Sequence, residues 1–208
     1  MTTERRRLAL VHAAHTATGA PPGIDRAAFS SACLSDSYEV LADLEEVRAG
    51  IVGAGPAVAD LLWPADLQVP DPAASIRSVA EQVGAGADEL VMIPADVPDL
   101  PGLVLAKVFK ALNRADVCIA PARNTSGCVA IGLRLPWPDW ITVELDLDTD
   151  PADELRRLQP GRGRVAIGPD WHRMCSATAV NRLDPRLEGW ESTRALLSGH
   201  PYLLAGGP

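Results

Sequence analysis

The chain has 208 residues, of which 47% are hydrophobic and 22% are charged. This length and composition predict one globular domain and argue against a largely disordered chain. There are 19 basic and 27 acidic residues, which give a net charge of -8. The first 104 positions carry only 6 basic residues against 15 acidic ones. Because that half offers no basic face, we expect no nucleic acid among the partners.

The cysteines and the first twenty residues bear on where the protein works. The four cysteines form no C-x-x-C pair, and a chain of this size needs no disulfide framework, so we interpret them as reduced thiols in a cytoplasmic protein. Three arginines, Arg5 to Arg7, precede a short apolar stretch that His12 and His15 interrupt. We interpret this stretch as a first strand and not as a signal peptide. The longest uncharged run, residues 8–24, contains two prolines, two histidines and two glycines, so we expect no membrane span.

Short apolar runs alternate with amphipathic segments along the whole chain. In chain order the sequence predicts a strand at 8–12, a helix at 25–46, a strand at 47–52, a helix at 57–62, a strand at 66–69, a helix at 73–83, a strand at 89–93, a helix at 101–113, strands at 116–120, 128–133 and 140–145, a helix at 150–158, a strand at 164–167 and a helix at 188–197. Asp25 is suited to cap the first helix, and Pro101 to begin the fourth. This alternation predicts an α/β fold with three layers, in which helices cover both faces of a mixed, mostly parallel central sheet of the Rossmann-like kind.

Acidic residues follow two of the predicted strands. In an open parallel sheet, the ligand crevice lies beyond the carboxyl ends of the strands. Asp96 follows the strand at 89–93, and Asp146, Asp148 and Asp150 follow the strand at 140–145. If these strand ends are neighbours, Asp96 and one member of the second group could share one Mg²⁺ or Mn²⁺ ion. The alternative is that these aspartates only solvate strand ends and cap a helix, and the spacing alone favours it.

Three segments carry a resemblance to a known superfamily. They are Pro-Asp-Pro at 70–72 with Ala-Gly-Ala-Asp-Glu-Leu-Val-Met-Ile-Pro-Ala-Asp-Val-Pro at 85–98, Pro-Ala-Arg-Asn-Thr-Ser-Gly-Cys at 121–128, and Leu-Asp-Leu-Asp-Thr at 145–149. Together they resemble the GT-A-like nucleotidyltransferases, and most of all the phospholactate and phosphoenolpyruvate guanylyltransferases. The resemblance spans roughly residues 8–158.

The resemblance implies a site and a reaction. It implies that Asp96 and Asp148 are metal ligands, with Mg²⁺ or Mn²⁺ as the cofactor. It also implies a transferase that uses a nucleoside triphosphate or a nucleotide sugar as donor and a phosphorylated small molecule as acceptor. In the nucleotidyl reaction, an acceptor phosphate would attack the α-phosphate of the donor and pyrophosphate would leave. The positions that match the nucleotide-binding segments are Arg123, Asn124 and Gly127; Arg77 stands where the family has an amide that reads the base, and it could meet a phosphate instead.

The chain departs from the family in its first loop. The family has lysine and arginine there to bind the triphosphate, whereas residues 11–24 contain neither. A triphosphate carries about four negative charges, and one metal ion offsets two of them. Because the first loop supplies no further cations, we expect a lower affinity for the triphosphate. An alternative from another functional class therefore stays open, namely a catalytically degenerate GT-A-fold protein that acts as a binding module. The presence of both Asp96 and Asp148 favours the transferase.

Other polar residues have plainer interpretations. His12 and His15 could suggest a metal pair, but on a strand that runs into a loop we expect them to face different ways. The segment Trp171 to Cys175 is interpreted as packing. We divide the chain into a GT-A-like domain, residues 1–158, and a C-terminal extension, residues 159–208. The extension, with its aromatic residues Trp171, Trp190 and Tyr202, is expected to pack on the same domain or on a second subunit of a homodimer.

Overall fold

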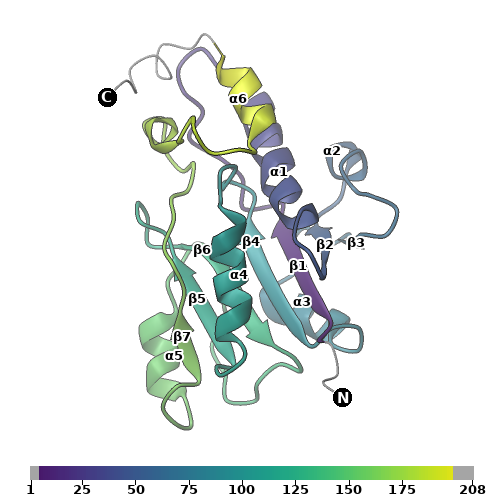
Figure 1. Cartoon of the computed structure of the whole chain (residues 1–208), viewed down its shortest axis with the longest axis vertical. Coiled ribbons are helices and arrows are strands. Elements are labelled where there is room, and N and C mark those ends of the chain that lie inside the picture. The colour runs from purple at the N-terminus through teal and green to yellow at the C-terminus, as the bar shows by residue number, and fades with distance from the viewer. Residues whose placement is uncertain (1–4, 199–208) are drawn as a thin grey trace.

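The computed structural model describes residues 5–198, apart from the side chains of residues 56 and 57. Its centre is one seven-stranded sheet in the order β3-β2-β1-β4-β6-β5-β7 (Figure 1). Within the described part of the chain, β6 alone runs antiparallel to its neighbours. The strands are β1 (Arg7–His12), β2 (Val47–Val52), β3 (Leu67–Val69), β4 (Glu89–Pro94), β5 (Val117–Pro121), β6 (Cys128–Arg134) and β7 (Val165–Ile167).

Helices cover both faces of this sheet. Alternate residues of β4 point to opposite faces: Leu90 and Met92 join one apolar core, and Val91 joins the other with Ile93. Helices α3 and α5 pack on the first face, and α1 and α4 pack on the second. The helices are α1 (Arg26–Ala42), α2 (Pro56–Ala59), α3 (Ile76–Val83), α4 (Gly102–Ala111), α5 (Ala152–Leu158) and α6 (Glu191–Leu197), and a 3₁₀ turn spans Ala179–Arg182.

The predicted α/β fold with a mixed, mostly parallel sheet is confirmed. The predicted Asp25 cap is also present, because its carboxylate accepts a hydrogen bond from the Ala28 amide at 2.8 Å. The strand predicted at 140–145 is wrong: this segment is irregular. The reason is that β6, which precedes it, already pairs with β4 on one side and with β5 on the other. The segment is instead fixed by side chains, such as the Trp140 indole that donates to Asp116 at 3.0 Å.

The C-terminal extension is built onto both the sheet and α1. Strand β7 pairs in parallel with β5. The side chain of Asp36, on α1, is buried and accepts hydrogen bonds from the amides of Ser192 and Thr193 at 2.9 and 2.8 Å. These amides lie in the first turn of α6, so Asp36 caps that helix from a neighbouring one. The boundary at residue 158 stays a prediction, and Tyr202 lies outside the described residues.

The strand order creates a switch point between β1 and β4. The chain leaves β1 through α1 toward β2, whereas it leaves β4 through α4 toward β5, on the other side. In open α/β sheets a ligand crevice forms where neighbouring strands diverge in this way. The two loops that follow these strands are tied together by a hydrogen bond from the Ala95 amide to the His15 carbonyl at 2.9 Å. None of the helices within residues 5–198 has the length and apolar character needed to cross a membrane.

Candidate functional site

An arginine from the C-terminal extension lies between the two aspartates that the sequence singles out. The Nε of Arg173 lies 2.8 and 3.1 Å from the two carboxylate oxygens of Asp96. Its Nη2 lies 2.8 Å from Oδ1 of Asp148, and its Nη1 donates to the Leu147 carbonyl at 2.7 Å. The side chains of Asp96 and Arg173 are only 1% and 5% exposed, whereas that of Asp148 is 58% exposed. One guanidinium thus bridges a buried and an exposed carboxylate.

Two residues that are predicted to contact a nucleotide, Asn124 and Gly127, lie against this arginine. Asn124 accepts a hydrogen bond from the Arg173 amide at 3.0 Å and donates to the Arg173 carbonyl at 2.8 Å. A Cβ atom at Gly127 would lie 2.7 Å from Nη1 of Arg173 and 2.5 Å from the Leu147 carbonyl oxygen. Real Cβ atoms essentially never approach other atoms so closely. A residue without a side chain is therefore required where the guanidinium passes.

The electrostatics of this group follow from burial and from the three charges. Burial raises the pKa of Asp96 to about 6, although the positive charge of Arg173 acts in the opposite direction. Burial would also raise the pKa of Asp148, but His15 and Arg173 outweigh it and hold that pKa below its usual range. For Arg173, burial alone would lower the pKa, but Asp96 and Asp148 outweigh this effect and raise it. At neutral pH the group therefore contains two carboxylates and one guanidinium.

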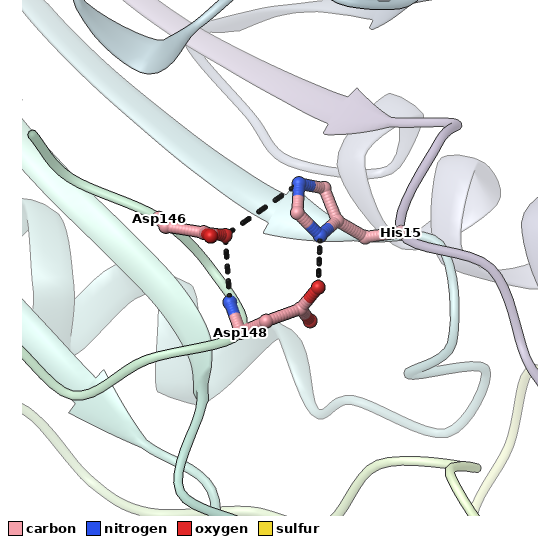
Figure 2. Close-up of side chains that lie close together, drawn as sticks. All are labelled: His15, Asp146 and Asp148. Carbon is pink, nitrogen blue, oxygen red and sulfur yellow. Dashed lines mark hydrogen bonds and ion pairs between the residues drawn. The ribbon is translucent and has the colours of Figure 1, made fainter.

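His15 and Asp146 lie beside Asp148 (Figure 2). The Nδ1 atom of His15 is 3.0 Å from Oδ2 of Asp148, and its Nε2 atom is 4.0 Å from Oδ1 of Asp146. The same Asp146 oxygen accepts a hydrogen bond from the Asp148 amide at 2.9 Å. One potential ligand atom from each of these three side chains lies within 4.8 Å of the other two. We call His15, Asp146 and Asp148 the outer cluster.

A pocket of about 270 Å³ adjoins the outer cluster. His12 and His15 line it together with Asp146, and the residues just before and at the start of α3, residues 72–76, form another wall. The expectation that His12 and His15 face different ways is wrong, because their rings meet edge to face with centroids 4.7 Å apart. The chain turns directly after β1, as the bond from the His15 amide to the His12 carbonyl at 3.2 Å shows, and this turn brings the rings together.

The two predicted arginines lie outside the group around Arg173. Arg123 forms an exposed ion pair with Asp170, with Nε 2.8 Å from Oδ2, and its guanidinium lies over the ring of Trp171. It therefore steadies the segment that leads to Arg173. Arg77, on α3, donates to the Ile141 carbonyl at 2.5 Å and lies over the ring of Trp137. The Arg77 guanidinium thus contacts the irregular segment that follows β6 and not the group around Arg173.

The position of Arg173 sets a condition on the predicted metal site. All four oxygens of Asp96 and Asp148 lie within 3.1 Å of a nitrogen of Arg173 or His15. As the side chains stand, the guanidinium fills the place that an ion shared by the two carboxylates would take, and the arrangement does not fit such an ion. The metal role of Asp96 and Asp148 stays a prediction, and it requires that Arg173 withdraw.

Reasoning from the sequence missed Arg173 as part of the site. It lies 77 residues from Asp96 along the chain, and no local pattern marks it. Its segment, Trp171 to Cys175, was interpreted as packing, which holds for Met174 but not for the guanidinium. A signal was nevertheless available, because two neighbouring carboxylates at a strand edge require a cation, and the first loop supplies none.

Comparisons with known proteins find sequence similarity over part of the chain. Residues 68–145 match a family described as uncharacterized proteins conserved in bacteria, DUF2064. A phosphoenolpyruvate guanylyltransferase of Chloroflexus aggregans is 31% identical over 97 residues, which are 44% of this chain and 48% of that protein. The match thus spans about half the length of that curated relative.

Two solved structures are similar over most of the chain. One, from Desulfovibrio desulfuricans and described as a nucleotide-diphospho-sugar transferase, has a TM-score of 0.67 at 17% identity and covers 97% of this chain and 98% of its own. The other, a 4-diphosphocytidyl-2C-methyl-D-erythritol synthase from Anaerococcus prevotii, has a TM-score of 0.50 at 11% identity over 79% and 88% of the two chains. The resemblance drawn from the sequence is therefore confirmed at the level of the fold, which is similar to that of a nucleotide-diphospho-sugar transferase.

Proposed function

We propose that this protein is a nucleotidyltransferase that binds a nucleoside triphosphate at the switch point between β1 and β4 and transfers its nucleotidyl group to a phosphorylated small molecule. The observation that carries the proposal is the position of the polar residues. Asp96, after β4, and His15, after β1, meet at the edge where this fold places its ligands. A nucleotide sugar as donor, with transfer of the sugar, would use the same edge.

The pocket beside the outer cluster is the proposed place for the nucleoside part of the donor. Its volume of about 270 Å³ is close to the lower end of the range for ligand sites, roughly 300 to 1,000 Å³. Such a pocket suits a base and its sugar, and it leaves the phosphates to extend along the edge. There an oxygen of the acceptor phosphate would form a new bond to the α-phosphorus as the bond to the pyrophosphate breaks. A divalent metal would supply positive charge against the charge that develops in this step.

The residues of this chain can contribute binding and orientation. The described side chains that line the pocket include no lysine. Arg77 and Arg123 already bind protein atoms, namely the Ile141 carbonyl and the Asp170 carboxylate. This part of the chain therefore offers few cations to the phosphates. Arg123 is 51% exposed and could exchange its bond to Asp170 for a phosphate. We therefore propose Arg123 as a phosphate contact, whereas Asn124 and Gly127 act through Arg173.

A second candidate function is ligand binding without catalysis. The specific observation that favours it is the bridge of Arg173 between Asp96 and Asp148, which leaves neither carboxylate free. In this case the edge would bind a nucleotide or another small ligand without turnover.

Two measurements on the full chain separate these functions. The first is a thermal-shift screen against the four nucleoside triphosphates and the common nucleotide sugars, with and without Mn²⁺ or Mg²⁺. A ligand present at 100 times its Kd stabilises the native state by about 2.7 kcal/mol. The second follows pyrophosphate release from GTP with phosphoenolpyruvate, the acceptor that the name of the Chloroflexus aggregans relative suggests, and then from the other nucleoside triphosphates with other phosphorylated acids; for nucleotide sugars, release of the nucleotide is followed instead. Binding with release supports the transferase, binding alone supports the second candidate, and no binding of any donor refutes the transferase and a nucleotide as the ligand of the second candidate.

A further inference from the structure

We propose that the outer cluster of His15, Asp146 and Asp148 is the divalent-cation site of this protein, in place of a site shared by Asp96 and Asp148. The inference deepens the proposed function, and only the catalytic use of the ion rests on that function. Four observations support it: the geometry of the cluster, its charge, a buried histidine nitrogen beside it that has no hydrogen-bond partner among the described residues, and its donor atoms.

The geometry suits one ion. Ligands of an octahedral ion at about 2.1 Å are roughly 3 Å apart when adjacent and roughly 4 Å apart when opposite. In the outer cluster, one ligand atom from each of the three side chains lies within 4.8 Å of the other two, and the Nδ1 atom of His15 is already 3.0 Å from Oδ2 of Asp148. The side chains face one another across a common space (Figure 2). Small rotations of exposed side chains are enough to place three donors around one cation.

The charge of the site calls for a second cation. Arg173 carries one positive charge, whereas Asp96, Asp146 and Asp148 carry three negative charges. The loop after β1, which in the related family brings lysine and arginine, contributes none here, because residues 11–24 contain neither. A divalent ion at the outer cluster would neutralise this excess while Arg173 stays on Asp96.

His12 gives an independent indication of a ligand at this place. It is only 4% exposed, and it lines the same pocket as His15 and Asp146. Its Nε2 atom is 3.0 Å from the Ala74 carbonyl oxygen, but its Nδ1 atom has no hydrogen-bond partner among the described residues. A buried polar atom without a partner is uncommon in native proteins and calls for an explanation. A hydrated ion at the outer cluster would supply one, because the ring of His12 packs against that of His15 with centroids 4.7 Å apart, and a water ligand of the ion could hydrogen-bond to this nitrogen.

The donor atoms point to the kind of ion. Imidazole nitrogen is a common ligand of transition metals, whereas Mg²⁺ prefers ligand sets made of oxygen. One imidazole with two carboxylates therefore favours Mn²⁺ or a similar transition metal over Mg²⁺. The side chain that hydrogen-bonds to the Asp96 carboxylate is Arg173, whose guanidinium cannot ligate a metal, so a site built on the carboxylates of Asp96 and Asp148 alone would contain only oxygen ligands and would show no such preference.

The test measures metal binding on the full chain without nucleotide. Mn²⁺ is titrated into the protein, and the free ion is followed by its electron paramagnetic resonance signal. We expect one site, and we expect His15→Ala and Asp146→Asn each to raise its Kd at least tenfold. Asp96→Asn should change the Kd less than threefold, and so should Asp139→Asn, a matched control at an exposed aspartate outside the cluster. Thermal unfolding of each variant checks that the fold is intact.

A second variant tests the role of the nitrogen ligand. His15→Asp converts the cluster to an oxygen-only set, so we expect the ratio of Mg²⁺ to Mn²⁺ affinity to rise relative to that of the unmodified protein. The inference is overturned if Mn²⁺ does not bind, if it binds equally well to all variants, or if Asp96→Asn abolishes binding while His15→Ala does not. These outcomes are independent of the proposed function, which fails separately when Mn²⁺ binds as expected but no donor nucleotide does.

Discussion

Replacing Arg173 by methionine should destabilise the protein by about 3–5 kcal/mol, the usual cost of removing one partner of a buried ion pair. The variant keeps an unbranched apolar side chain similar to the aliphatic part of arginine, but it removes the guanidinium that pairs with the carboxylate of Asp96, which is 1% exposed. It also removes the bonds to Asp148 and to the Leu147 carbonyl. For a domain of this size, 1 kcal/mol shifts the Tm by about 2–4 °C, so the Tm should fall by roughly 6–20 °C.

The double variant Arg173→Met/Asp96→Asn provides the control for this reasoning. If the cost comes from an unpaired buried charge, removal of that charge should restore much of the stability, and the two substitutions will be strongly non-additive. Urea unfolding at pH 7.5 gives all four free energies of the cycle. An Arg173→Met variant as stable as the unmodified protein, or a double variant whose loss equals the sum of the single losses, would refute the bridge. In the single variant, saturating Mn²⁺ should recover stability, since Asp96 and Asp148 become free to share an ion.

Three further predictions concern the elements that hold the site. Gly127→Ala should cost about 1–3 kcal/mol, because its Cβ would collide with the Leu147 carbonyl and the guanidinium, whereas Gly161→Ala, with no atom within 4 Å of the added Cβ, should be nearly neutral; urea unfolding compares them. Asp36→Ala should cost about 2 kcal/mol and expose the C-terminal segment to protease, because α6 loses its cap, while Glu39→Ala, an exposed neighbour on α1, should not. Because burial raises the pKa of Asp96 to about 6, above its ordinary value, the folded state takes up this proton before the unfolded state does as the pH falls. As the pH falls from 6 to 4, protonation of Asp96 should therefore raise the free energy of unfolding by at most about 1 kcal/mol per pH unit. The Asp96→Asn variant should lack this rise when unfolding is measured as a function of pH.

The fold could be predicted from the sequence because its signals are local. Buried strands such as Glu89–Pro94 are short apolar runs, and the Asp25 cap and Pro101 mark where helices begin. The segment at 140–145, for which a strand was predicted, is apolar enough to form one. Whether a neighbouring strand is free to pair with it depends on the order of strands in the sheet, which no local sequence pattern contains.

The candidate site could be predicted only in part. Asp96 was singled out because it follows a recognisable strand, β4, and Asp148 because of the family resemblance, since the strand predicted before it is absent. The side chains that contact these carboxylates were not singled out, because Arg173 and His15 reach Asp148 through tertiary contacts over 25 and 133 residues. The same holds for Asn124 and Gly127, which occupy positions of a nucleotide motif but contact Arg173 in this chain. A motif fixes where a residue lies in the fold, and the surrounding chain decides what the residue contacts.

The two outermost strands, β3 and β7, are three residues each. An edge strand presents unpaired backbone groups to which another chain can add, and a very short edge gives such a partner little to bind. The longer strands β2 and β5 are shielded by these short neighbours at the ends of the sheet. Two copies of this protein are therefore poorly suited to join their sheets into one continuous ribbon. A homodimer would have to form through helices or loops, and its interface would owe its strength to side chains rather than to backbone hydrogen bonds.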